Sequence, residues 1–262
     1  AGNDVTLIAR GPHLAAMRDR GLTIKEEGTY LTSQPNITAD IQGISDTECL
    51  ILGVKAYSLS EIAPIIAPKL NPETLVVPAQ NGIPWWYFFS HGGGFDGTRL
   101  ESVDPGGLIE NAIPSTQVIG CVVYPAVQLV EPGVVQHIEG DRFSLGELDG
   151  SISDRVRALS QAIVGTGLRA PIRSNIRQDI WVKLLGNLAF NPISALTRAN
   201  MGEIATDRDV SRIVRAMMEE AFAVAEALNI KIPISIDQRI LGAEKVGAHK
   251  TSMLQDIEFG KP

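Results

Sequence analysis

The sequence contains no apolar run near 18 residues, the length that a helix needs to cross a membrane. It has two cysteines in 262 residues, Cys49 and Cys121, and their wide separation matches no metal or redox motif. The first residues, Ala1-Gly2-Asn3-Asp4, show neither the basic nor the apolar region of a secretory signal. We therefore expect a cytoplasmic protein without a membrane span or a bound metal, in which both thiols are small core residues.

Excess positive charge is also lacking, because the net charge is −7. Through Pro171 there are 11 Lys and Arg against 19 Asp and Glu, a net of −8, whereas the remainder has 12 against 11, a net of +1. An acidic first half argues against a nucleic-acid surface. It also means that local side chains, not the overall field, must hold any phosphate-bearing ligand.

The first part of the chain alternates short β-rich runs with helical segments. Continuous apolar runs such as Cys49 to Leu52 and Thr74 to Val77 are typical of strands buried on both faces of a parallel sheet. A strand is expected at Asp4–Ile8, and a small hairpin at 22–25 and 29–32. Further along the chain, a strand and a hairpin are expected from the segments 118–123, 133–137 and 142–145. Helices are expected at 12–20, 58–67 and 153–164. The alternation predicts a doubly wound α/β, Rossmann-like domain over residues 1–171.

The remainder, residues 172–262, is predicted to be all helical. Helices are expected over about 175–199, 209–228 and 233–248. Ligands of doubly wound sheets gather at the carboxyl ends of the strands. Lys55 and Asn81 both follow predicted strands directly, so both are expected at that edge.

An aromatic and glycine-rich stretch at about 85–114 interrupts the first domain. His91 to Gly94 is similar to the oxyanion-hole loop of some esterases, but that chemistry also needs a G-x-S-x-G turn around the serine, which the sequence lacks. We therefore interpret the stretch as a surface insertion fixed by its aromatic residues. The alternative for those aromatics is a dimer contact.

Lys183, Asn187 and Asn191 recur every fourth residue in an otherwise apolar helical run, so they share one helix face. Ammonium and amide groups on a buried helix are costly unless they are paired. One interpretation is a core helix whose polar stripe is satisfied by neighbouring backbone. The other is a cleft in which Lys183 donates a proton and the amides hold a small polar substrate, since desolvated lysines recur in acid–base catalysis.

These residues resemble the W-x-K-L-x-x-N-x-x-x-N-P signature of the ketopantoate reductases, the 2-dehydropantoate 2-reductases. The segment that begins Thr251-Ser252-Met253-Leu254-Gln255-Asp256 and ends at Pro262 is similar to the S-S-M-x-Q-D segment of that family. Leu52-Gly-Val-Lys55-Ala56 and Gln80-Asn81-Gly82 are two shorter matches. The motifs occur in the family's order over most of the chain, which makes the resemblance specific.

The resemblance implies reduction of ketopantoate to pantoate in pantothenate biosynthesis, with NADPH as the cofactor. Hydride addition to a ketone creates an alkoxide, which needs a proton donor, and Lys183 is implied in that role. The hydroxyl and carboxylate groups of the substrate suit Asn187, Asn191 and Ser252, with Ser252 and the amides after it at the carboxylate. The alternative for Ser252 is a cap on the helix that starts there.

Cofactor contacts are implied for Arg10, Lys55, Asn81 and Ala126. In dinucleotide-binding units an arginine near the position of Arg10 accommodates the 2′-phosphate of NADPH, where an acidic residue would bind the ribose of NADH. The resemblance puts Lys55 and Asn81 near the nicotinamide ribose and the reacting centre, so Asn81 also counts as a substrate residue. Ala126 corresponds to a backbone contact with the cofactor.

Three features depart from the family pattern. The G-x-G-x-x-G fingerprint is absent, and the family has it just before the equivalent of Ala1-Gly2. A glutamate expected shortly after Pro262 is also absent, and Met201-Gly202 replaces an asparagine-glycine pair, with Asn200 one position away. We therefore expect both domains to be truncated, the first at its start and the second at its end. The strand at Asp4–Ile8 should then have nothing to pair against, and residues 1–262 alone should fold poorly and bind NADPH weakly or not at all.

Two other functions remain open from the sequence. The same fold and lysine could reduce another branched 2-keto acid or an opine-type substrate. A non-catalytic NADP-binding regulator is the alternative from another class, in which Lys183 would be structural. In each case the expected partner is a small molecule, with no nucleic acid and no membrane, and a homodimer is a further expectation.

Overall fold

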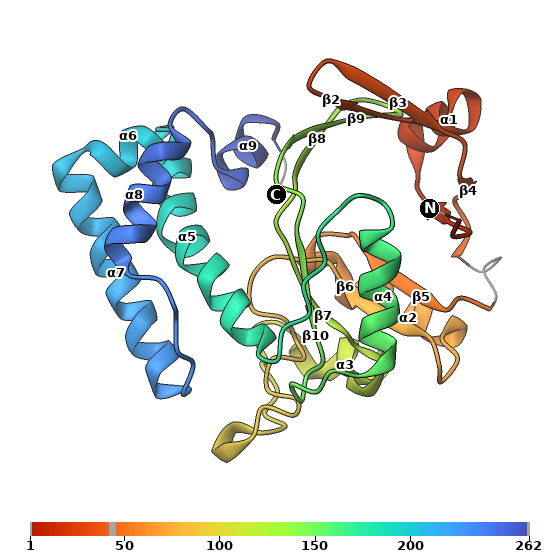
Figure 1. Ribbon diagram of the computed structural model, residues 1–262, viewed down its shortest axis with the longest axis horizontal. Helices are drawn as coiled ribbons and strands as arrows, with labels where there is room; N and C mark the ends of the chain where they lie inside the picture. Colours follow the sequence, from red (N-terminus) through yellow and green to blue (C-terminus); the bar gives the residue numbers. More distant parts are fainter. Residues whose placement is uncertain (1, 42–45, 261–262) are drawn as a thin grey trace. The chain divides into compact units, whose positions relative to one another are not determined.

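The computed structural model describes residues 2–41 and 46–260 (Figure 1). Ala1, Lys261 and Pro262, which belong to the ends discussed above, lie outside the described residues. The chain divides into two compact units, Ala1–Ile176 and Arg177–Pro262. The sequence placed this division near Pro171.

Short parallel strand pairs form the start of the first unit. Strand β1 (Thr6–Ile8) pairs with β4 (Asn36–Thr38), and β5 (Cys49–Leu52) pairs with β6 (Leu75–Pro78). The expectation that β1 has nothing to pair against is therefore wrong. The sequence hid β4 because three residues after Pro35 are too few to show a periodic pattern.

Strand β7 (Gly120–Val123) extends this parallel arrangement through a bridge between Val76 and Val118. Its other partner is β10 (Phe143–Gly146), which runs antiparallel to it. The segment at 142–145, expected in a strand-and-hairpin arrangement with 133–137, thus pairs with β7 instead. The hairpin partner of 133–137 is a strand that the sequence analysis did not predict.

A four-stranded sheet of order β3-β2-β9-β8 contains that missed strand. Strands β2 (Leu22–Glu26) and β3 (Thr29–Ser33) form the predicted hairpin, and β8 (Ala126–Glu131) and β9 (Val134–Glu139) form a second one. Gly133 has a φ of +83°, a left-handed conformation that glycine adopts without strain in the tight turn between β8 and β9. Parallel pairing of β2 with β9 joins the two hairpins.

Three helices of the first unit begin and end close to where the sequence predicts, whereas a fourth helix at 108–112 was not predicted. Helix α1 has Pro12 in its first turn, and Ser153 caps α4 by accepting a hydrogen bond from the Val156 N–H at 3.2 Å. Asp104, 1% exposed, accepts hydrogen bonds from Ile109 N and Glu110 N at the start of α3. The helices are α1 (Gly11–Arg20), α2 (Leu59–Ile66), α3 (Leu108–Ala112) and α4 (Asp154–Val164).

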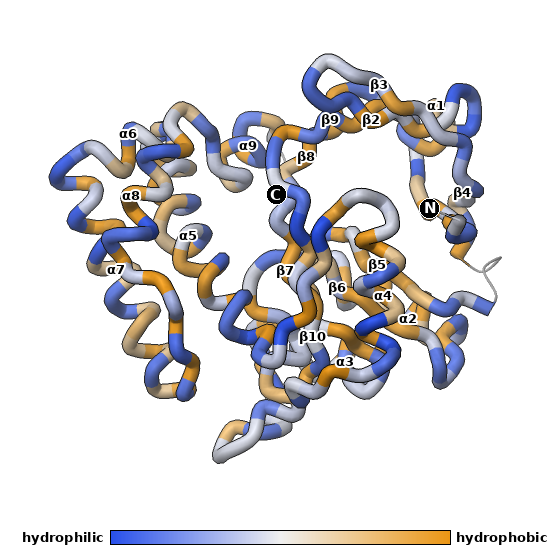
Figure 2. The backbone as a smooth tube through the Cα atoms, in the orientation of Figure 1, coloured by the Kyte–Doolittle hydropathy of each residue, from blue (hydrophilic) through white to orange (hydrophobic). Residues whose placement is uncertain are grey.

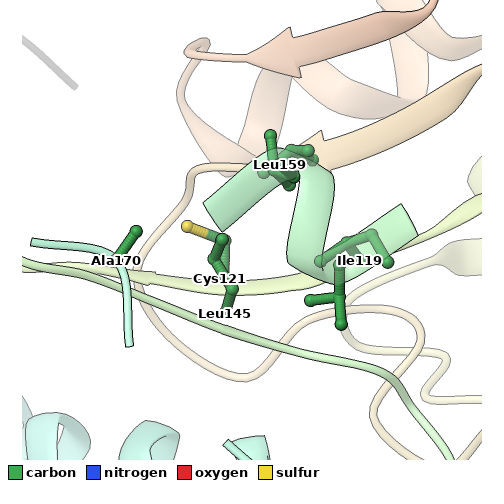
Figure 3. Packing of buried hydrophobic residues seen from close by; sticks show 7 residues of the cluster. Ile119, Cys121, Leu145, Leu159 and Ala170 are labelled. Carbon is green, nitrogen blue, oxygen red and sulfur yellow. The ribbon is translucent and has the colours of Figure 1, made fainter. Parts of the chain in front are cut away.

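Apolar side chains from β6, β7, β10 and α4 meet in one core of the first unit (Figure 3). Figure 2 shows the same concentration of hydrophobic residues along β5, β6 and β7. Ile119 and Leu145 are 0% exposed, and Cys121 lies among them as a small buried residue with a free thiol. The core therefore fixes the sheet whose strand ends carry the candidate residues.

The aromatic stretch at 85–114 is part of the fold of this unit. Trp85, Trp86 and Tyr87 are each at most 2% exposed, and Phe88 is 7% exposed. A Cβ at Gly120 would lie 2.9 Å from the Trp86 ring, so the strand backbone packs directly against the indole. The alternative that these aromatics form a dimer contact is wrong, because the chain itself buries them.

The second unit is helical, as predicted (Figure 1). Its helices are α5 (Ile176–Thr197), α6 (Met201–Thr206), α7 (Arg208–Ala227), α8 (Ile236–Val246) and α9 (Ser252–Glu258). Helix α6 was not predicted. Its signal was a capping box, in which Asn200 accepts from Glu203 N while Glu203 accepts from Asn200 N. Asn200 thus acts as a helix cap.

Helix α7 buries Val214, Met218, Ala221 and Ala225, which follow one another at helical spacing and give it an apolar face. The helices α6, α7 and α8 pack against one another. Among the described residues, no helix is both long and apolar enough to span a membrane.

Candidate active site

The polar stripe predicted from the sequence lies along α5. Lys183, Asn187 and Asn191 occupy successive turns of this helix, and each is half-buried. Leu185 and Ala189, which point to another side of the helix, are 0% exposed. The helix is thus embedded on its apolar side, and the stripe stays partly accessible.

The side-chain amides of the stripe are not satisfied by neighbouring backbone of the described residues. Within the part of the chain that the structure describes, neither Asn187 nor Asn191 makes a side-chain hydrogen bond. A purely structural stripe would be expected to satisfy these groups with neighbouring backbone. Half-buried amides with unused donors and acceptors are suited to bind a polar ligand.

Pro192 follows Asn191 inside α5. Proline has no N–H, so the carbonyl of Leu188 loses its usual helical partner, and the ring disfavours a straight helix at that point. Proline in a helix interior lowers the stability of the helix. Here it also leaves the carbonyl oxygen of Leu188 without its helical N–H partner, beside the polar stripe. This feature belongs to the N-P end of the recognised signature.

Ser252 is the first residue of α9, and its side chain is exposed. The residue that caps the helix is Thr251, which is 4% exposed and accepts a hydrogen bond from Leu254 N at 3.3 Å. The alternative in which Ser252 acts as the cap is therefore wrong. The Ser252 hydroxyl makes no hydrogen bond within the described residues and can bind a ligand.

Lys55 and Asn81 lie at the carboxyl ends of the neighbouring parallel strands β5 and β6, and both are exposed. Gln80 links the two strand ends, because its Nε2 donates to the carbonyl oxygens of Leu52 at 2.6 Å and Val54 at 3.1 Å. No role for Gln80 is predicted from the sequence. The only signal was its position in the Gln80-Asn81-Gly82 motif directly after a strand.

This strand edge suits a nicotinamide dinucleotide. Lys55 supplies a cation and Asn81 an amide on adjacent strands, at the edge where doubly wound sheets hold such cofactors. The Oε1 atom of Gln80 is buried and has no hydrogen-bond partner among the described residues, which leaves an acceptor at the same edge. A ligand with hydrogen-bond donors would satisfy it.

The two remaining cofactor candidates lie elsewhere in the first unit. Arg10 is exposed at the residue before α1, follows β1 closely and makes no capping hydrogen bond. Ala126 is half-buried and begins β8. The preceding Tyr124 ring stacks under the guanidinium of Arg142, with 3.8 Å between Cζ and the ring centroid.

A polar hollow of about 220 Å³ in the first unit contains none of the predicted site residues. Arg155 borders it and donates to both carboxylate oxygens of Glu147, at 2.7 and 2.6 Å, an arrangement that raises the pKa of the guanidinium. Glu147 also accepts a hydrogen bond from Ser153, the cap of α4. This network fixes the start of α4.

The cysteines offer no reactive group near these residues. Burial, with the neighbouring carboxylate of Glu48, raises the pKa of the Cys49 thiol to about 11, so it stays protonated and unreactive. Across residues 2–41 and 46–260, no group of three or more His, Cys, Asp and Glu side chains is arranged to hold a metal. Within the stripe of Lys183, Asn187 and Asn191, only the lysine side chain carries a titratable group.

Comparison with known proteins identifies the family. Residues 1–85 match the model of the ketopantoate reductase family PanE/ApbA, and residues 175–262 match the model of its C-terminal domain. A 2-dehydropantoate 2-reductase of Mesorhizobium japonicum is 48% identical over 259 residues, which cover 99% of this chain and 79% of that protein. The chain belongs to the ketopantoate reductase family.

Solved ketopantoate reductases share the fold. A protein of Ralstonia solanacearum MolK2, assigned as a ketopantoate reductase, superposes with a TM-score of 0.92 at 39% identity, over 97% of this chain and 79% of that one. A D-mandelate dehydrogenase solved with NADH and anilino(oxo)acetate has the same fold at 22% identity and a TM-score of 0.80, over 100% of this chain and 80% of that one. The predicted family and the predicted fold class, a Rossmann-like domain followed by a helical domain, are confirmed.

Proposed function

We propose that this ketopantoate reductase homologue reduces 2-dehydropantoate to pantoate for pantothenate biosynthesis, with NADPH as the hydride donor. The observation that carries the proposal is the 48% identity with a 2-dehydropantoate 2-reductase along 99% of the chain. The half-buried Lys183–Asn187–Asn191 stripe supports it, since it offers a proton donor beside two hydrogen-bonding amides.

Lys183 is the proposed proton donor. When bound, NADPH supplies the hydride that adds to C2 of the keto acid. The carbonyl oxygen of the substrate then carries negative charge, which the ammonium of Lys183 stabilises before it transfers a proton to that oxygen. Half-burial of Lys183 supports this role, because a lower local dielectric strengthens the attraction between ammonium and alkoxide.

Asn187, Asn191 and Ser252 are proposed to orient the substrate. Each amide offers one acceptor and two donors, which match the hydroxyl and carboxylate groups of ketopantoate. The exposed Ser252 hydroxyl at the start of α9 adds a further donor for the carboxylate. Fixed orientation of the keto group against the ammonium lowers the entropic part of the barrier.

Arg10, Lys55, Asn81 and Ala126 are the proposed cofactor residues. Arg10 is exposed after β1, where its guanidinium can pair with the 2′-phosphate that distinguishes NADPH from NADH. Lys55 and Asn81 provide a cation and an amide at the carboxyl edge of the parallel strands, and Asn81 is proposed to reach the substrate as well. The backbone of Ala126 adds a contact.

The proposed setting is the cytoplasm, with a small 2-keto acid as partner and a homodimer as the assembly. The free thiols of Cys49 and Cys121 support a reducing compartment. Size-exclusion chromatography with light scattering tests the dimer.

A substrate panel tests the proposed reaction. NADPH consumption by the full-length protein is measured with ketopantoate, other branched 2-keto acids, a phenyl-substituted 2-keto acid and opine precursors. The proposal predicts the highest kcat/KM with ketopantoate. A higher value with another acid would assign the second function considered above, and no turnover with any acid would favour a regulator that binds NADP.

A further inference from the structure

Arg239 of α8 lies directly against the backbone of α5 at Gly186, within the helical unit. A Cβ atom added to Gly186 would lie 2.8 Å from Cζ and 3.0 Å from Nε of Arg239, and would overlap with Nη2. Gly186 is buried and Arg239 is half-buried. The guanidinium therefore occupies the space that a side chain at position 186 would fill.

This contact falls on the part of α5 that carries the candidate proton donor. Gly186 is three residues after Lys183 and one residue before Asn187, so on the helix surface it neighbours Lys183 directly. Cβ bonds in a helix tilt toward its N-terminus, so the space above Gly186 lies on the Lys183 side. The guanidinium of Arg239 thus lies against the helix turn that carries Lys183.

We propose that Arg239 binds the carboxylate of the 2-keto acid and selects for substrates that carry one. This inference rests on the proposed function and extends it to a residue outside the recognised motifs. A guanidinium presents N–H donors in a planar fork that matches the two carboxylate oxygens. Lys183 and Arg239 together attract an anionic substrate. Lys183 contacts its keto oxygen, and Arg239 binds its carboxylate.

Gly186 leaves the space that the Arg239 guanidinium occupies. Glycine inside a helix is disfavoured relative to alanine, so a buried glycine in the middle of α5 needs a compensating reason. The close approach of the Arg239 guanidinium supplies it, because any side chain at position 186 would displace the charged group. A guanidinium is the end of a flexible side chain, so Gly186→Ala should move it without unfolding the helix.

Steady-state kinetics of the full-length protein test the proposal. Arg239→Gln should raise the KM for ketopantoate about ten- to a hundredfold, the range expected for a charge-assisted hydrogen bond, and leave the KM for NADPH unchanged. Gly186→Ala, which keeps the arginine but displaces it, should give the same split. Arg212→Gln is the matched control, because Arg212 is an exposed arginine of α7 and its loss removes the same net charge.

Inhibition by pantoate and by its uncharged carboxamide separates carboxylate binding from a structural role. Arg239→Gln should weaken inhibition by pantoate about ten- to a hundredfold and leave inhibition by the carboxamide unchanged. The double variant Gly186→Ala/Arg239→Gln should weaken inhibition by pantoate little more than Arg239→Gln alone, since the guanidinium that Gly186→Ala displaces is already absent. Equal losses for both inhibitors, or an unchanged KM in Arg239→Gln, would overturn the proposal.

The outcome is independent of which acid the enzyme prefers. If the wild type reduces another 2-keto acid better than ketopantoate, the same variants are measured with that acid and with its own uncharged amide. The proposed substrate would then be wrong, whereas the comparison of that acid with its uncharged amide would still test the role of Arg239.

Discussion

Arg10 is an exposed cation at the end of a strand, and such residues are often merely solvated. Its proposed role depends on one chemical difference between two cofactors, the 2′-phosphate. A charge-assisted contact with that phosphate contributes roughly 1.5–3 kcal/mol, about a ten- to hundredfold change in affinity. The selectivity between NADPH and NADH is therefore the informative quantity.

We expect Arg10→Ala to weaken NADPH binding about ten- to a hundredfold and to leave NADH binding nearly unchanged. Fluorescence titration of the full-length protein with each cofactor measures both constants. Arg18→Ala, which removes a charge from the exposed face of α1, serves as the control. Equal losses for both cofactors in Arg10→Ala would show that Arg10 supports the fold.

The residues of the signature could be predicted from the sequence because they repeat at helical spacing within one segment. Gln80 and Arg239 could not, since their contacts are made with residues distant in the sequence. Gln80 contacts carbonyls at positions 52 and 54, and Arg239 contacts position 186, so no local pattern connects them. The unusual glycine between Lys183 and Asn187 was the one local sign of the second contact.

Elements of ten or more residues could be predicted because an apolar face repeats several times along them. Some of the shortest elements could not, as β4 and α6 illustrate. The short strands β2, β3, β5 and β6 were predicted because each is a compact β-rich or apolar run. Strand β8 was also missed, because the predicted segment at 133–137 covers only the second strand of the β8–β9 hairpin. Their pairing places Ala126 at the start of a sheet strand.

Thr251→Ala should lower the stability of α9, because the Thr251 side chain accepts the hydrogen bond of Leu254 N at the helix start. Loss of such a cap typically costs about 0.5–2 kcal/mol. Since Ser252 begins this helix, the KM for the keto acid should rise as well. Amide hydrogen exchange of residues 252–258 and steady-state kinetics measure the two effects.

Thr251→Ser is the matched control, because it keeps the capping oxygen and should retain both exchange protection and KM. An unchanged exchange rate in Thr251→Ala would contradict the capping role. Faster exchange with an unchanged KM in Thr251→Ala would show that substrate binding does not depend on the stability of α9. That result would contradict the proposed role of Ser252.

At the scale of the whole first unit, one histidine joins segments far apart in the sequence. His137 of β9 has Nδ1 2.5 Å from Oε1 of Glu26 on β2 and Nε2 2.5 Å from the carbonyl oxygen of Gly140. A neutral imidazole has one N–H, so only the imidazolium donates to both acceptors. The Gly140 carbonyl contributes most to raising the pKa of His137, and the Glu26 carboxylate adds to it.

This contact should make the four-stranded sheet more stable at lower pH. The folded-state pKa of His137 is raised above 6.5, so its contribution is fully present below about pH 6.5 and is lost as the pH rises through the folded value. NMR titration of the His137 ring should give a pKa above 6.5, and Glu26→Gln should lower it. A pKa at or below 6.5 in the wild type would contradict this assignment.

The overall division into a Rossmann-like unit and a helical unit could be predicted, because the hydrophobic pattern changes from strand-like runs to helical spacing. The chain spans 79% of the length of its Mesorhizobium relative. The candidate cofactor residues are carried by the first unit, and the candidate proton donor by the second. The activity proposed for the molecule depends on both.

The most direct test is the turnover of Lys183→Ala in the full-length protein, measured as ketopantoate-dependent NADPH consumption beside the wild type. General acid catalysis contributes about 10²–10⁴-fold, so kcat should fall within that range while the dissociation constant for NADPH and the thermal unfolding midpoint stay close to wild type. A Lys183→Ala enzyme with near-normal kcat would contradict the central assignment of Lys183 as the proton donor.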